Sequence, residues 1–146
     1  MEGNEMKTVI VYYSFTGSTR RLSKKLAEET GADLCEIKEA AERSKLSAYV
    51  LGSFAAMRQK KVNLQSFGED LAQYDKIVIA MPIWAGYPAP AINSLLDMLP
   101  EGKDVELIMV SGSGSSGGSA EKTKALVRDK GCRVAGYKDV KTSSVE

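Results

Sequence analysis

"YYSFTGSTRRLSKKLAEETG", residues 12–31, is the stretch that decides how this chain folds. It begins at the end of an apolar run, "KTVIVYY" (7–13), whose β-branched and aromatic side chains are typical of a strand buried on both faces. Its second half carries Leu22 and Leu26 at helical spacing, and Gly31 stands where a left-handed residue would end a helix. A strand followed by a short polar loop and a helix predicts the first part of a βαβ unit.

The rest of the chain repeats this alternation. We expect further strands at about 32–37, 76–81, 105–110 and 132–137, and further helices at about 44–60, 90–99 and 120–130. Pro82 is expected to end the strand before it, and Pro90 suits the first turn of its helix. Alternating strands and helices predict an α/β fold with a parallel sheet of five strands, covered on both faces. The chain of 146 residues is expected to form one domain, 1–146.

Composition excludes several classes of function. The formal net charge is only +1, so neither nucleic acid nor an anionic membrane is expected as a partner, and no apolar run is long enough to span a bilayer. Histidine is absent, which excludes His-assisted serine or cysteine hydrolysis and most zinc chemistry, and no metal site is expected. Cys35 and Cys132 are isolated, as in a reduced cytoplasmic protein.

Three loops with unusual residues follow expected strands, at 14–19, 82–87 and 111–119. In an open parallel sheet, ligands bind beyond the carboxyl ends of the strands, at the point where the strand order reverses. We therefore expect these three loops to meet at a single site.

The first loop suits a phosphate group. The helix after it presents unpaired backbone N–H groups and a partial positive charge, and Gly17 lets the backbone approach closely. The hydroxyls of Ser14, Thr16, Ser18 and Thr19 can donate hydrogen bonds without adding a fixed charge. The alternative is that these serines and threonines only cap the helix.

The second and third loops suit a flat ring. The second contains the only tryptophan, Trp84, which can form a platform for a planar ligand or can pack against the neighbouring helix. Gly86 can adopt a positive φ that turns a backbone group toward such a ligand, and Tyr87 either shields the ligand or packs within the loop. The third loop, "SGSGSSGGS" (111–119), connects a strand and a helix of the same domain, so its glycines indicate close backbone contact with a flat ligand.

These motifs resemble the flavodoxin family over almost the whole chain. The resemblance is carried by "YYSFTGSTRRLSKKLAEE", "IAMPIWAGYPAPAINSLLDML" and "SGSGSSGGSAEKTKAL". It implies a three-layer flavodoxin-like sandwich with strand order 2-1-3-4-5 and FMN as the cofactor, with no metal and no catalytic residue of the protein's own. The implied cofactor-binding residues are Ser14, Thr16, Gly17, Ser18 and Thr19 around the phosphate, Pro82, Ile83, Trp84, Ala85, Gly86 and Tyr87 on one side of the ring, and Ser111, Gly112, Ser113, Gly114 and Gly117 along its other edge.

The resemblance implies electron transport as the function. We expect a low-potential electron carrier between redox partner proteins, because a site of low dielectric constant without cations disfavours a reduced flavin anion. The alternative is an FMN-dependent NAD(P)H:quinone-type oxidoreductase, since this near-neutral chain lacks the acidity of carrier flavodoxins, although no second dinucleotide motif is visible. A receiver domain is not favoured, because Met81 and Pro82 stand where it needs a carboxylate, and a small phosphatase is not favoured, because the first loop has no cysteine.

Two further features concern partners. The basic residues Arg20, Arg21, Lys24 and Lys25 are interpreted as a solvated helix face in preference to a docking patch. Flavodoxin-like domains normally close with a helix after the last strand, and this sequence ends just after 142–144, so that helix is expected to be missing. We expect the apolar sheet face beside it to be covered by a second copy of the chain, a partner protein or a further segment.

Overall fold

In the computed structural model, which describes residues 6–40, 56, 59, 61–67 and 70–145, the centre of the molecule is one mostly parallel sheet. Its strand order is β2-β1-β3-β5-β6, and a short strand, β4, pairs antiparallel with β3. Counted without β4, this is the predicted order of five parallel strands. The strands are β1 (Thr8–Tyr12), β2 (Asp33–Glu36), β3 (Lys76–Trp84), β4 (Tyr87–Pro88), β5 (Asp104–Ser111) and β6 (Arg133–Lys141).

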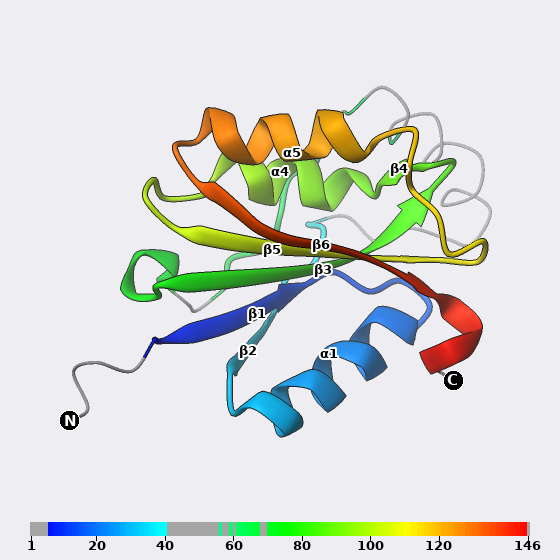
Figure 1. Ribbon diagram of the computed structural model, residues 1–146, viewed down its shortest axis with the longest axis horizontal. Coiled ribbons are helices and arrows are strands. Elements are labelled where there is room, and N and C mark those ends of the chain that lie inside the picture. The colour runs from blue at the N-terminus through cyan, green and yellow to red at the C-terminus, as the bar shows by residue number, and fades with distance from the viewer. Residues whose placement is uncertain (1–5, 41–55, 57–58, 60, 68–69, 146) are drawn as a thin grey trace.

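Helices cover both faces of the sheet. Figure 1 shows α1 (Ser18–Thr30) below the sheet, and α4 (Pro90–Asp97) with α5 (Ala120–Asp129) above it. Pro90 occupies the first turn of α4, as predicted, because its missing N–H has no partner to lose there. Two short 3-10 helices are also present, η3 (Leu71–Gln73) and η4 (Thr142–Val145). The helix expected at 44–60 lies outside the described residues, except for Ala56 and Gln59.

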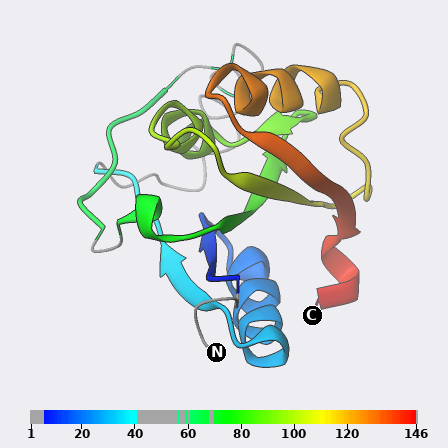
Figure 2. The same cartoon turned by 60° about the vertical axis from the view of Figure 1, so that its left-hand side comes forward.

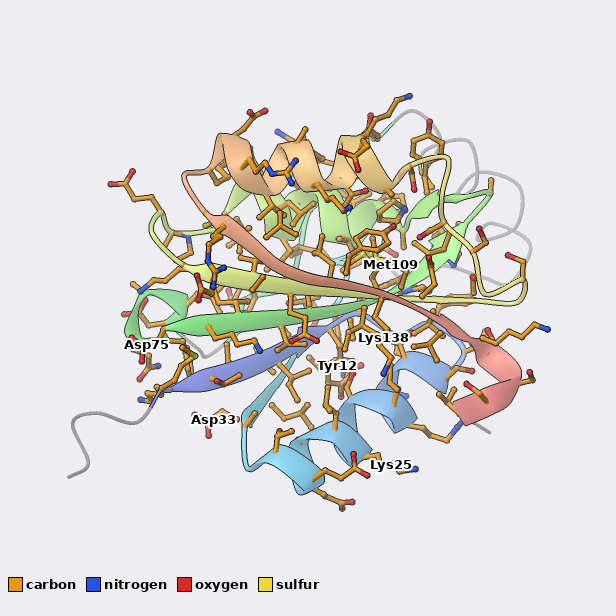
Figure 3. All side chains as sticks on the ribbon, viewed as in Figure 1. Tyr12, Lys25, Asp33, Asp75, Met109 and Lys138 are labelled. Atoms are coloured by element: carbon orange, nitrogen blue, oxygen red, sulfur yellow. The ribbon has the colours of Figure 1, made fainter. Side chains whose placement is uncertain are left out.

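Successive side chains of β1 point to opposite faces of the sheet, and both faces are buried, which explains the unbroken apolar run. Val9 and Val11 are fully buried in the larger core cluster, which contains the apolar side chains of α4, while Ile10 and Tyr12 belong to a smaller cluster with Leu22 of α1. Figure 3 shows the same division of the sheet, with Tyr12 on the α1 side and Met109 on the α5 side. A strand buried on both faces needs apolar residues at successive positions.

The expectation that Pro82 ends its strand is wrong, since β3 continues through Pro82 to Trp84. Pairing of β3 with β1 reaches only Ala80, whereas pairing with β5 continues to Pro82. The Ala80 carbonyl accepts the Tyr13 N–H on the β1 side, so the backbone nitrogen of Pro82, two residues on, points to the same side. Because β1 has already ended there, the missing N–H of proline costs no sheet hydrogen bond.

The sheet face near the C-terminus carries both apolar and charged residues. There β6 presents Lys138 toward α1, and beside it Lys76 forms an ion pair with Glu106 at 2.9 Å. Among the described residues, the exposed large hydrophobic side chains are Met6 and Met98, and neither lies on this face. This face thus combines charged residues with the apolar side chains of Val78, Ile108 and Val140, and its cover by a second copy, a partner or a further segment stays a prediction.

Cys35 and Cys132 are both buried, and no disulfide joins them. Over the described ranges, no helix is long and apolar enough to cross a membrane. Within the same residues, no group of three or more His, Cys, Asp or Glu side chains is placed to hold a metal ion.

Candidate functional site

The three loops identified from the sequence follow neighbouring strands. Strands β1, β3 and β5 lie side by side and parallel, so the segments after their carboxyl ends lie along one edge of the sheet. The turn between β3 and β4 lies between the other two loops. The topology therefore brings the three loops to one edge of the sheet, as predicted.

The first loop leads into an α1 N-terminus that no described side chain caps. Gly17 is the N-cap residue, with a left-handed φ of 107°, and the first turn of α1 contains no acidic residue. The Ser14 hydroxyl accepts a hydrogen bond from the Gly17 N–H at 3.1 Å, which shapes the loop, while Ser18 and Thr19 are buried and Thr16 is exposed. The alternative interpretation of these hydroxyls as helix caps is not supported, and the N-terminal N–H groups suit an anion.

Arg21 is exposed, as the solvated-face interpretation expected, but it also contacts the first loop. Its Nη2 donates a hydrogen bond to the Ser18 hydroxyl at 3.2 Å, and its Nη1 lies 3.2 Å from the point where a Cβ at Gly17 would stand. We expected an uncharged first loop, but the Arg21 guanidinium lies against it. The spacing of three between Ser18 and Arg21 is the signal that could have indicated this contact.

The second loop is a tight hairpin that holds Trp84 against the first loop. Ala85 and Gly86 have φ values of 54° and 84°, the two positive values that a two-residue type I′ turn requires, so the predicted positive φ of Gly86 is confirmed. The half-buried ring of Trp84 meets the rings of Tyr13 and Phe15 edge to face, with centroids 6.2 and 6.0 Å apart. The Trp84 ring is therefore held by two aromatic residues at the start of the first loop and also packs on the core cluster.

Tyr87 is tied to α5. Lys122 donates a hydrogen bond to the Tyr87 hydroxyl at 2.9 Å, and its ammonium group lies 5.3 Å from the centre of the ring. This position places a cation beside the second loop, where the sequence interpretation had assumed none. Pro82 and Ile83 belong to β3, with Ile83 packed on the core cluster.

The third loop is held by serine hydroxyls that the sequence interpretation did not select. Ser119 is fully buried, and its hydroxyl donates a hydrogen bond of 2.6 Å to the Gly86 carbonyl. Ser116 is also buried and donates to Asp139 at 2.6 Å. Ser111, a predicted residue, accepts the Gly114 N–H at 2.9 Å. The glycine- and serine-rich composition indicated the loop but could not show which hydroxyls tie it down.

A partly buried polar cluster fixes α1 to the sheet behind the first loop. Glu36 of β2 accepts hydrogen bonds from the Tyr12 hydroxyl at 3.1 Å and from the Arg20 guanidinium. Burial acts to raise the pKa of Glu36, but the hydrogen bond and charge of Arg20 outweigh it, so this pKa is lowered. Burial, followed by the nearby Glu36 charge, raises the pKa of Tyr12. Arg20 thus holds α1 to β2, whereas its neighbour Arg21 contacts Ser18 of the first loop.

A hollow of about 920 Å³ lies away from the predicted residues. Leu71, Ser94 and Pro100 are among its lining residues, near the amino ends of β3 and β5. None of the predicted cofactor-binding residues lines it. The candidate site is therefore identified by the loops at the carboxyl ends and not by this hollow.

Comparison with known proteins connects this arrangement to one family. The sequence model of the flavodoxin family matches residues 7–141. The crystal structure of a flavoprotein in complex with FMN from Lactobacillus acidophilus NCFM is 25% identical in sequence and superimposes with a TM-score of 0.76, covering 91% of this chain and 92% of that one. A crystal structure from Bacteroides uniformis ATCC 8492 is 26% identical, has a TM-score of 0.79, and covers 97% of this chain and 96% of its own. An uncharacterized protein of Archaeoglobus fulgidus is 25% identical over 132 residues, which are 90% of this chain and 84% of that protein.

Proposed function

The chain belongs to the flavodoxin family, and we propose that it binds FMN and carries electrons between redox partner proteins. The observation that carries this proposal is that three loops converge at a single edge of the sheet. One lies at an uncapped helix N-terminus, one presents an aromatic platform, and one is rich in glycine. When bound, FMN supplies reversible acceptance and release of electrons.

The first loop fits a terminal phosphate. A phosphate dianion gains from the unpaired N–H groups and partial positive charge at the start of α1, where no acidic side chain competes. The positive φ of Gly17 is a conformation that residues with a side chain rarely adopt. Arg21, hydrogen-bonded to Ser18, adds a full positive charge at the same end of the helix.

The second and third loops fit the two sides of a flavin ring. Trp84 is ordered by two aromatic neighbours, so little side-chain freedom is lost when a ring stacks on it. Ser119 links the turn at Gly86 to the third loop, which keeps these two loops at a defined separation. Backbone groups of the third loop are then positioned to contact the edge of the ring.

The kind of residue that the site gathers favours a carrier over an enzyme with its own substrate. Hydroxyls, backbone groups and aromatic rings bind and orient a cofactor, but they do not form a general acid–base pair. The alternative, an FMN-dependent NAD(P)H:quinone-type oxidoreductase, is favoured by the low net charge of +1 and by Lys122 beside Tyr87, since a cation stabilises a reduced, anionic flavin.

Two measurements test the proposal. Titration of the protein with FMN, FAD and riboflavin, followed by quenching of flavin fluorescence, should show the tightest binding for FMN and much weaker binding for riboflavin. The FMN-loaded protein should then lose its blue-light absorption slowly with NADH or NADPH and show no catalytic turnover when a quinone is added. Rapid turnover would favour the oxidoreductase, and equal affinities for riboflavin and FMN would contradict the phosphate site.

A further inference from the structure

A groove of about 500 Å³ runs between α1, the end of β6 and η4. Leu22 and Leu26 of α1, Val140 of β6 and Val145 of η4 contribute the apolar part of its lining. Figures 1 and 2 show α1 and η4 on the same side of the sheet, and the two elements are in contact. The groove therefore offers an apolar strip along α1, which is 13 residues and about 20 Å long.

Basic side chains surround this apolar strip. Arg21 and Lys25 line the groove from α1, and Lys138 and Lys141 line it from β6. Figure 3 shows Lys138 on the α1 side of the sheet and Lys25 on the helix that it faces. Within the described part of the chain, none of these three lysines forms an ion pair, so their charges are available to a partner.

The acidic groups of the groove do not balance these cations. Glu29 and Asp139 are the carboxylates of its lining, against four basic side chains. Asp139 already accepts a hydrogen bond from the Ser116 hydroxyl. The groove thus concentrates positive charge on a chain whose net charge is only +1.

The groove adjoins the candidate cofactor site. At one end Arg21 contacts Ser18 of the first loop. The stem of Lys141 lies 3.1 Å from the place where a Cβ at Gly114 of the third loop would stand, so the groove also borders that loop. A partner segment in the groove would therefore lie beside the loops that hold the flavin.

From these contacts we infer that the groove docks an acidic amphipathic segment of a redox partner protein, an inference that rests on the proposed carrier function. Apolar side chains of the segment pack on Leu22, Leu26 and Val140, and its carboxylates pair with Lys25, Lys138 and Lys141. A second copy of the chain is the weaker occupant, because a two-fold symmetric contact would place this positive surface against itself.

A matched pair of peptides tests the inference on the FMN-loaded chain of 146 residues. The first is a helical peptide of about 13 residues with leucines on one face and glutamates on the other, and the second has lysine at every glutamate position. Binding is followed by backbone amide chemical shifts. The acidic peptide should bind with shifts concentrated on α1, the end of β6 and η4, and its affinity should fall at least tenfold as salt is raised from low to physiological ionic strength.

Variants separate this groove from a general effect of charge. Lys138→Glu combined with Lys141→Glu should weaken binding of the acidic peptide at least tenfold. If that double variant does not fold, Lys138→Gln combined with Lys141→Gln, which removes the charges without reversing them, should weaken binding in the same direction. Lys24→Glu is the matched control, since Lys24 is an exposed lysine of α1 that does not line the groove. All these variants should bind FMN like the unmodified protein.

Four results would overturn the inference. These are equal binding of the lysine peptide, no binding of the acidic peptide, an equal loss of binding in Lys24→Glu, and self-association in sedimentation that Lys138→Glu abolishes. Absence of FMN binding would instead contradict the proposed function, and the same peptide titration on the flavin-free chain would then show whether the groove docks the acidic peptide.

Discussion

The hydroxyl of Ser119 donates a 2.6 Å hydrogen bond to the backbone carbonyl of Gly86, and this bond joins the second and third loops across 33 residues of sequence. Both partners lie where the flavin ring is proposed to bind. Because Ser119 is fully buried, water cannot easily replace its hydroxyl.

Ser119→Ala should therefore loosen the site. The unpaired Gly86 carbonyl should lower the free energy of unfolding by about 1–3 kcal/mol in urea denaturation, and FMN should bind more weakly. Ser115→Ala is the control, since Ser115 is exposed and its hydroxyl accepts a hydrogen bond from Gly117 of the same loop. Equal stability and FMN affinity in both variants would show that the link between the loops has no role.

Trp84→Ala should weaken FMN binding by roughly 1–3 kcal/mol, or about 5- to 150-fold, because it removes the proposed stacking surface. Midpoint potentials should also change, since oxidised and reduced flavins interact differently with the ring. Phe15→Leu, which removes one edge contact to Trp84 but keeps the platform, should have a smaller effect. Unchanged affinity and potentials in Trp84→Ala would assign Trp84 to core packing alone.

Arg21→Gln should lower affinity for FMN by on the order of fivefold and leave riboflavin binding unchanged, because only FMN carries the phosphate near this guanidinium. Parallel fluorescence titrations with both flavins measure the difference. Arg20→Gln is the matched control: Arg20 pairs with Glu36 behind the loop, so its loss should not discriminate between the two flavins. A loss of the same size for both flavins in Arg21→Gln would assign Arg21 a purely structural role.

Glu36 should make stability depend on pH. Its pKa is lowered from the ordinary value of 4.5, because Arg20 outweighs the effect of burial, so the folded state favours the ionised carboxylate. This contribution is fully present above pH 4.5 and is lost as the pH falls through the lowered pKa. For a partly exposed pair we expect about 0.2–1 kcal/mol.

Glu36→Gln measures that contribution. The difference in unfolding free energy between the unmodified protein and the variant should be constant from neutral pH to about 5 and should shrink below that. Asp97 and Asp104 also have lowered pKa values from basic partners, but both are present in the two proteins and cancel in the difference. A difference that does not change with pH would contradict the ion pair with Arg20.

The sequence by itself determined the features that depend on short spacings. The unbroken apolar run of β1, the left-handed Gly31 at the end of α1, and Pro90 at the start of α4 all follow from backbone geometry within a few residues. The alternation of such elements then leaves few ways to build a sheet, and the predicted strand order was confirmed.

Only the tertiary structure decided how the loops are held. Pro82 can continue its strand because β1 pairs with β3 only as far as Ala80, so no strand beside Pro82 needs its N–H. That pairing register depends on segments far apart in the sequence. Arg21 folds back on Ser18, Ser119 reaches Gly86, and Lys138 lies on the sheet face that α1 covers, each through an environment that residue type does not encode. Local patterns specify which backbone shapes are favourable, whereas the partner of a side chain depends on which segments packing brings within a few ångströms of it.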